Sequence, residues 1–147
     1  MPTSAIAREA GAGTRDLFNE VVMGGIDHDT PGADWYRSGN GEVWAMIASS
    51  EGAIGYLSLN YSKDGVVRAI AYDGVVPSAE TVRDESYPLA TTLSIYTLGE
   101  ADPNERAFLD FVTGDRGRSI AEDLDFFPIS ARLRRELSLR ARQIGEP

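Results

Sequence analysis

The most chemically suggestive stretch of the sequence is a glycine-rich turn placed directly before a predicted helix. Residues 7–24 read AREAGAGTRDLFNEVVMG, in which Arg8 precedes Gly11, Gly13 and Thr14. The first turn of a helix has free N–H groups and partial positive charge, and glycines let a backbone approach an oxyanion closely. A threonine hydroxyl adds a donor, and the guanidinium fork matches a tetrahedral oxyanion. The pattern is therefore chemically suited to phosphate, sulfate or a carboxylate.

The same residues also fit an ordinary turn followed by a helix cap. In that interpretation Gly11 and Gly13 make the turn, Thr14 is the N-cap, and the arginine is solvated. Because such caps are common, spacing alone favours this second interpretation. The stretch lacks the lysine of a P-loop and the third glycine of a dinucleotide fingerprint, so neither nucleotide motif is present.

Composition limits the classes of function. The chain has 147 residues, 42% of them hydrophobic, which is enough for one domain with a core or for two small lobes. Its net charge is -9, with 23 acidic and 14 basic residues, which argues against a nucleic-acid surface. An anion site in such a chain must work through local donors.

Metal, thiol and triad chemistry are not expected. The chain has no cysteine, which excludes disulfides, thiol catalysis and cysteine-ligated zinc. Its one histidine, His28, lies in a predicted surface loop beside Asp27 and Asp29, and these acids lack EF-hand spacing. No apolar run is long enough to span a bilayer, and residues 1–11 lack the basic start and apolar block of a signal peptide.

Hydrophobic periodicity and turn residues predict alternating strands and helices, which is an α/β pattern. Strands are expected at 4–8, 53–61, 66–72 and 89–97, and residues 26–41 are expected to be a loop. Helices are expected at 14–23, at 43–48, after a cap at Ser78, from Pro103, at 116–124, and after a cap at Ser130.

Four ordered blocks of this sequence resemble the phosphate-binding proteins that serve ABC transporters. AREAGAGTRDLFNEVV resembles that family's R-x-x-G-S-G-T segment, and NGEVWAMIASSEGAIGYLSLNYS is similar to its helix and AIGY strand. VVPSAETVRDESYPLATTLSIYT and FLDFVTGDRGRSIAEDLDFFPIS are similar to its P-S-x-E-T-V and G-F-x-P-L segments. The blocks extend over about residues 4–130. The resemblance implies a partial, type II periplasmic-binding-protein-like α/β fold and a non-enzymatic, extracytoplasmic receptor without a cofactor.

The resemblance also implies which residues contact the ligand. Arg8, Gly13 and Thr14 correspond to phosphate contacts, and Gly11 shapes the turn. The family's central serine falls on Ala12, which has no hydroxyl and can donate only its backbone N–H. Two further departures, expected to concern packing or family branch, are threonine in place of arginine and arginine in place of glutamine, at Thr91 and Arg118.

Family members are about twice as long, as a two-lobed receptor with one ordinary domain per lobe requires. The resemblance covers only their C-terminal half, so residues 1–86 are expected to belong to the second lobe and residues 88–147 to the C-terminal segment of the first. The expected partners are phosphate or a similar oxyanion, an ABC transporter permease and the missing N-terminal half. That half carries further phosphate donors and an acidic acceptor. A partial or split gene, or a fragment, is the expected origin.

Two other functions remain open at this point. The chain could be a structural or interaction domain that keeps the fold but has lost phosphate binding, as Ala12 permits. An enzyme that holds a phosphorylated substrate at GAGT is the third hypothesis, and the sequence offers no general base for it.

Overall fold

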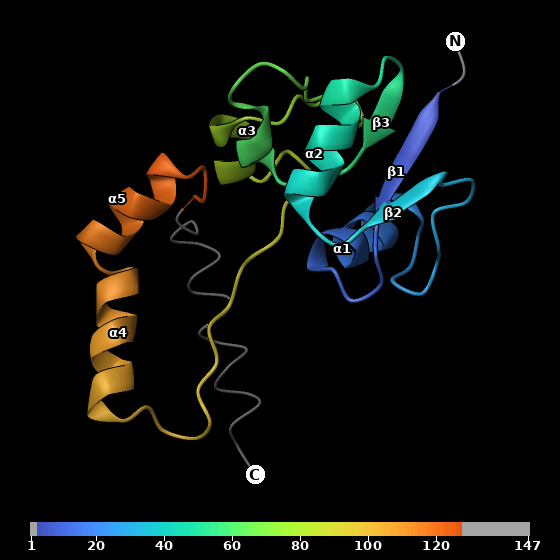
Figure 1. The fold of residues 1–147 in the computed structure, drawn as a ribbon. Coiled ribbons are helices and arrows are strands. Elements are labelled where there is room, and N and C mark those ends of the chain that lie inside the picture. The colour runs from blue at the N-terminus through green and yellow to red at the C-terminus, as the bar shows by residue number, and fades with distance from the viewer. Residues whose placement is uncertain (1–2, 128–147) are drawn as a thin grey trace. The chain divides into compact units, whose positions relative to one another are not determined.

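The computed structural model describes residues 3–127, which fall into two compact units (Figure 1). Unit 1 comprises Met1–Pro77 and Tyr87–Thr91, and unit 2 comprises Ser78–Ser86 and Thr92–Pro147. Each unit is described by itself below. Among the described residues, no helix is both long enough and apolar enough to cross a membrane.

Unit 1 contains a three-stranded parallel sheet. Its strands are β1 (Ser4–Arg8), β2 (Trp35–Arg37) and β3 (Ala53–Gly55), in the order β2-β1-β3. Parallel neighbours need crossover connections, which here contain α1 (Gly13–Val22) and α2 (Asn40–Ser49). Because the carboxyl ends of β1 and β2 lie at one edge, the turns that follow these two strands lie at the same edge of the sheet.

The core of unit 1 forms where α2 packs against β1 and β3. Ile6, Ala7 and Val43 are almost fully buried, with exposed fractions of 2%, 1% and 0%. Gly55 allows the close approach, because a Cβ there would lie 2.8 Å from the carbonyl oxygen of Ile6 and 3.0 Å from Val43 Cγ1. The AIGY block therefore contains a glycine for a packing reason.

The structure confirms the strand at 4–8 and the helices expected in unit 1, and corrects the loop at 26–41. That stretch contains β2 and the start of α2. A strand of three residues is too short to show an alternating pattern, so the surrounding Asp, Gly and Pro residues hid it.

The two strands expected at 53–61 and 66–72 are largely wrong. Only Ala53–Gly55 is a strand, Leu59–Ser62 is a 3₁₀ helix (η1), and no strand forms at 66–72. Val66 and Ile70 are 58% and 60% exposed, whereas Val67 is buried, and no strand of the described chain pairs with this run.

Unit 2 contains three helices in its described part. They are α3 (Ala79–Arg83), α4 (Pro103–Thr113) and α5 (Asp115–Asp123). All three were expected from the sequence, including the Ser78 cap, whose hydroxyl oxygen accepts from the Thr81 amide at 3.2 Å. The helix expected after Ser130 lies outside the described residues.

Specific contacts connect the helices of unit 2. The Arg83 guanidinium lies 3.3 Å from the Glu122 carboxylate and 5.0 Å from the centre of the Phe127 ring. The Arg118 Nε–H donates to the Thr113 carbonyl at 2.7 Å, which places this departure from the family pattern in the α4–α5 turn. The strand expected at 89–97 is wrong, because this segment pairs with no strand in the described chain.

Candidate anion-binding site

The glycine-rich segment is a turn from β1 into α1, as the sequence predicted. Arg8 ends the strand, Gly13 is the first residue of the helix, and Ala12 is its N-cap. Gly11 lies in this turn with φ +82°, a conformation that glycine adopts without strain. The interpretation of Thr14 as the N-cap is wrong, since Thr14 is the second residue of the helix.

Two amides at the start of α1 are free of protein acceptors. Within residues 3–127, neither the Gly13 nor the Thr14 backbone N–H has a hydrogen-bond partner. A Cβ at Gly13 would meet no atom within 4 Å, so the space beside its Cα is open. The Ala12 amide, by contrast, donates to the Glu9 carbonyl at 3.3 Å. The turn therefore presents two bare amides.

The Arg8 side chain lies under this turn and is 8% exposed. Its Nη1 donates to the Thr14 hydroxyl at 3.0 Å and to the side-chain oxygen of Asn40. Its Nη2 and Nε donate to the carbonyls of Ser38 at 2.6 Å and Arg37 at 3.3 Å. The guanidinium thus touches the first turn of both α1 and α2, where both helices present partial positive charge.

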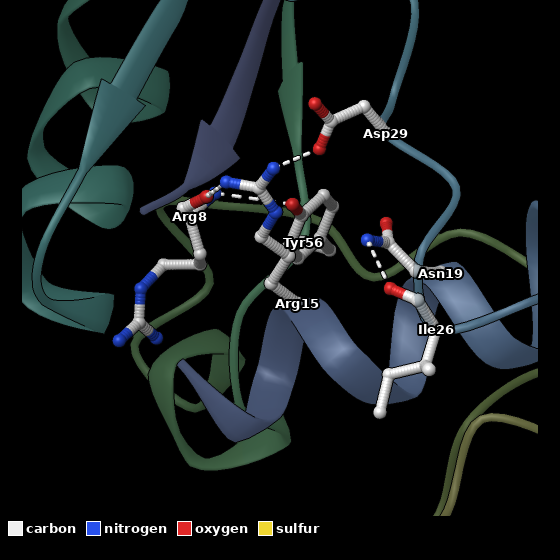
Figure 2. A network of polar contacts seen from close by, with 6 residues as sticks. All are labelled: Arg8, Arg15, Asn19, Ile26, Asp29 and Tyr56. Atoms are coloured by element: carbon white, nitrogen blue, oxygen red, sulfur yellow. Dashed lines mark hydrogen bonds and ion pairs between the residues drawn. The ribbon is translucent and has the colours of Figure 1, made fainter. Parts of the chain in front are cut away.

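No carboxylate lies within ion-pair distance of Arg8 in the described part of the chain, so every acceptor around it is neutral. Neighbouring Arg15 differs, because its guanidinium is paired with Asp29. Figure 2 shows the Arg8 guanidinium extending away from the Arg15–Asp29 pair. Buried charges are normally paired, so a buried guanidinium with only neutral acceptors is suited to pairing with an anion.

The backbone of Arg8 is fixed from two sides (Figure 2). The Tyr56 hydroxyl accepts from the Arg8 amide at 3.1 Å, and Arg15 Nη1 donates to the Arg8 carbonyl at 3.2 Å. The Tyr56 ring stacks on Phe18 of α1, with centroids 4.2 Å apart and an interplanar angle of 13°. The AIGY tyrosine therefore connects α1 to the end of β1.

A carboxylate fixes the turn that carries the acceptors of Arg8. Glu42 accepts from the Gly39 amide at 3.1 Å and from the amide and hydroxyl of Ser38 at 3.0 and 2.9 Å. These bonds, the Gly39 amide first and the Ser38 hydroxyl second, hold the pKa of Glu42 below its ordinary value. The Ser38 carbonyl is thereby held where it accepts from Arg8.

Sequence reasoning found Arg8, Gly11, Gly13 and Thr14, and the structure brings these residues together in one turn. It missed the residues that hold the arginine, which are Asn40, Tyr56 and Arg15. The sequence signal that could have found Asn40 was SGNGE, a second glycine-rich turn directly before a helix, like the GAGT turn before α1.

The other candidate residues have structural contacts. The His28 Nδ1 lies 2.9 Å from the Met23 carbonyl oxygen, and the Asp29 carboxylate pairs with Arg15. In the part of the chain that the structure describes, no cluster of three or more histidine or acidic residues could hold a metal. The arrangement around Arg8 offers hydrogen-bond donors and positive charge, which suits binding of an oxyanion and supplies no general base.

The fold and the site together define a class of protein. A PBP superfamily domain matches residues 1–116, so the chain belongs to the PBP superfamily. Among its relatives is the phosphate-binding protein PstS of Bacillus subtilis, which is 32% identical over 126 residues, covering 85% of this chain and 41% of that protein. The PstS protein of Borreliella burgdorferi is 25% identical over 133 residues, or 84% of this chain and 48% of that protein.

Solved structures of phosphate-binding proteins are also similar to this chain. A substrate-binding protein of Clostridium perfringens, assigned to phosphate ABC transport and crystallised with bound phosphate, has a TM-score of 0.70 and 26% identity. The match covers 88% of this chain and 53% of that one. A phosphate-binding protein of a Streptococcus pneumoniae phosphate ABC transporter has a TM-score of 0.64 and 28% identity, over 88% of this chain and 52% of that one.

These matches confirm the resemblance and the partial PBP-like α/β fold. The chain spans about half the length of the relatives it matches, from 41% to 53% in the examples above. The relatives are named as binding proteins, in agreement with the expectation that the chain is not an enzyme.

Proposed function

We propose that unit 1 binds inorganic phosphate, or a similar oxyanion, at the turn between β1 and α1. The Arg8 guanidinium and the Gly13 and Thr14 amides are the donors, Gly11 shapes the turn, and Ala12 contributes its amide if its bond to Glu9 opens. The observation that carries the proposal is the buried Arg8, whose partners are all neutral. An oxyanion there would compensate the charge and satisfy both bare amides.

The threonine hydroxyl has its hydrogen available for the ligand. Its oxygen accepts from Arg8 Nη1 at 3.0 Å, so the O–H bond must point elsewhere. Thr14 therefore offers both a hydroxyl and an amide donor from the first turn of α1.

In the biological setting we propose, the chain is part of the extracytoplasmic substrate-binding protein of an ABC phosphate importer and interacts with its permease. The relatives named above support this setting, since they are phosphate-binding proteins. The protein binds and releases its ligand without chemical change.

The remaining half of such a receptor is a further proposed partner, and unit 2 provides the support for it. None of its described residues is buried, and most of its large apolar side chains are exposed. Leu93, Tyr96 and Leu98 are 74%, 88% and 102% exposed, on a segment that pairs with no strand in the described chain. Exposed apolar surface of this extent marks an interaction site, and the relatives contain about as much chain again as is present here. We propose that residues 1–86 belong to the second lobe and that the segment from residue 88 onward packs on the other half.

Titration calorimetry with inorganic phosphate tests the proposed site. We expect measurable but weak binding, because a site on one lobe leaves part of the anion in water. Each missing charge-assisted hydrogen bond weakens binding by about 1.5–3 kcal/mol. Arg8→Ala should lower the affinity at least a hundredfold, whereas Arg68→Ala, which removes the same charge from an exposed position of unit 1, should leave it unchanged.

Equal binding by all three proteins would contradict the assignment of Arg8. Absence of binding by a folded wild-type chain would favour the alternative, a structural or interaction domain that has lost phosphate binding. Affinity tighter than about 1 μM for the isolated monomer would show that the single lobe holds a complete site.

A further inference from the structure

Asn40 is the side chain that joins Arg8 to a third part of unit 1. Its Oδ1 accepts from Arg8 Nη1, and its Nδ2 donates to the Ser58 hydroxyl at 2.9 Å. Arginine can only donate, so the amide oxygen must face Arg8 and the amide nitrogen must face Ser58. The two contacts hold the amide in one orientation, and with it the Nη1 end of the guanidinium.

The side chain at position 40 is also uncharged. Asn40 is the first residue of α2, where an acidic side chain would interact favourably with the helix dipole. An aspartate there would occupy nearly the same space and would form an ion pair with Arg8. The helix dipole and the ion pair would both interact favourably with an aspartate at position 40, yet the chain has the uncharged amide.

We propose that Asn40 is a positioning residue of the anion site: it holds the Arg8 guanidinium through a neutral acceptor and so leaves its positive charge for the ligand. The inference rests on the proposed phosphate site and adds a residue to it. Arg15, whose charge is compensated by Asp29, shows the contrasting arrangement in the same unit. That arginine anchors the Arg8 carbonyl rather than facing the site.

The experiment compares Asn40→Asp with the wild type by phosphate calorimetry and by thermal unfolding. The variant should unfold at the same or a higher temperature, because the aspartate pairs with a buried charge and the Ser58 hydroxyl can turn to donate to it. Its phosphate affinity should fall about a hundredfold, since a carboxylate then stands beside the anion and neutralises Arg8. A residue with only a structural role would not produce these opposite changes.

Asn104→Asp is the matched control, because it adds the same charge at an exposed position of unit 2. It should leave the phosphate affinity unchanged, and because Asn104 also lies in the first turn of a helix it controls for the contribution of the helix dipole to the unfolding temperature. Ser58→Ala is the second variant. It removes one of the two contacts that orient the amide, and it should weaken phosphate binding several-fold in a protein that stays folded.

The outcomes separate this inference from the proposed function. If the wild type binds phosphate, Arg8→Ala does not, and Asn40→Asp binds like the wild type, the role of Asn40 is wrong and the site stands. If Asn40→Asp does not fold and Ser58→Ala binds like the wild type, the inference is also wrong. If the folded wild type binds no phosphate, both the proposed function and this inference fail.

Discussion

Unit 1 and unit 2 contain similar kinds of helix but differ in what those helices bury. In unit 1, α2 packs on a sheet and Val43 is completely buried. In unit 2, helices α4 and α5 are amphipathic, yet Phe108 and Phe111 of α4 are 58% and 48% exposed. The difference is the sheet, which unit 1 supplies for itself and the described part of unit 2 lacks.

In both units local signals are sufficient to place a helix but not to bury it. The helix α4 begins at Pro103 after Asp102, whose carboxylate accepts from the Asn104 and Glu105 amides at 2.8 Å each. These interactions are all within four residues, so they form whether or not a partner covers the apolar face. Burial of the apolar face depends on residues that are distant in the sequence or that belong to a separate chain.

The largest expected effect is the loss of stability when a buried apolar residue of unit 1 is replaced by aspartate, compared with the same replacement of an exposed apolar residue of unit 2. Val43→Asp places a charge where the side chain is 0% exposed and should destabilise unit 1 by about 4 kcal/mol or more. Leu98→Asp changes a side chain that is 102% exposed and should leave the free energy of unfolding unchanged. Urea unfolding followed by circular dichroism measures both.

A strong destabilisation by Leu98→Asp in the isolated chain would mean that unit 2 already has a covered core. The proposal of a separate covering half would then be wrong.

A smaller effect concerns the helix caps, which also differ between the units. Helix α4 has a side-chain cap in Asp102, whereas Ala12, at the same position of α1, makes no such bond. Ala12→Ser should stabilise α1 by about 1 kcal/mol, and its hydroxyl can donate to the anion while it caps the helix. Phosphate binding should tighten about tenfold, as one added charge-assisted bond predicts.

Asp102→Ala is the comparison variant. It should lower helix stability in unit 2 by about 1 kcal/mol and leave phosphate binding unchanged. If Ala12→Ser stabilises the protein without tightening binding, the serine position of the family does not face a ligand in this chain.

The smallest expected effect is a pH dependence that originates at Glu42. The pKa of this carboxyl is lowered from its ordinary value of 4.5, so its contribution to stability is present above that pH. The contribution is lost as the pH falls through the lower pKa of the folded state, because the protonated group no longer accepts from Gly39 and Ser38 in the same way. Hydrogen exchange of the α2 amides as a function of pH measures it.

Glu42→Gln should lower the protection factors of the α2 amides at neutral pH. In this variant the protection factors should not change further between roughly pH 6 and pH 3. An identical pH profile for wild type and variant would show that another group controls this turn.

The sequence predicted the turn that carries the candidate site because its signals are local, whereas the assignment of its residues to phosphate came from the resemblance. Arg8, Gly11 and Thr14 lie within seven residues, and a strand, a tight turn and a helix start follow from their types. The contacts of Asn40 and Tyr56 with Arg8 join residues 32 and 48 positions apart, and no periodicity reports such distances. These two side chains required the structure.

Two of the expected strands could not be predicted from such local signals. Residues 66–72 and 89–97 have the β-branched and aromatic residues of strands, and both predictions were wrong in this chain. A strand needs a partner that supplies hydrogen bonds, which composition cannot guarantee. The apolar residues at 93–98 are those expected of a strand, and their exposure indicates that the neighbouring strand is not in the described chain.

The most direct test of the central claim is a two-dimensional amide NMR titration with inorganic phosphate. We predict saturable shifts at the Gly13 and Thr14 amides, together with the Arg8 guanidinium resonances, and none at residues 103–123 of unit 2. The two bare amides are the donors that the structure leaves open, so they must report the ligand first. Shifts confined to other residues, or unchanged spectra at phosphate concentrations where calorimetry detects binding, would contradict the anion site at the start of α1.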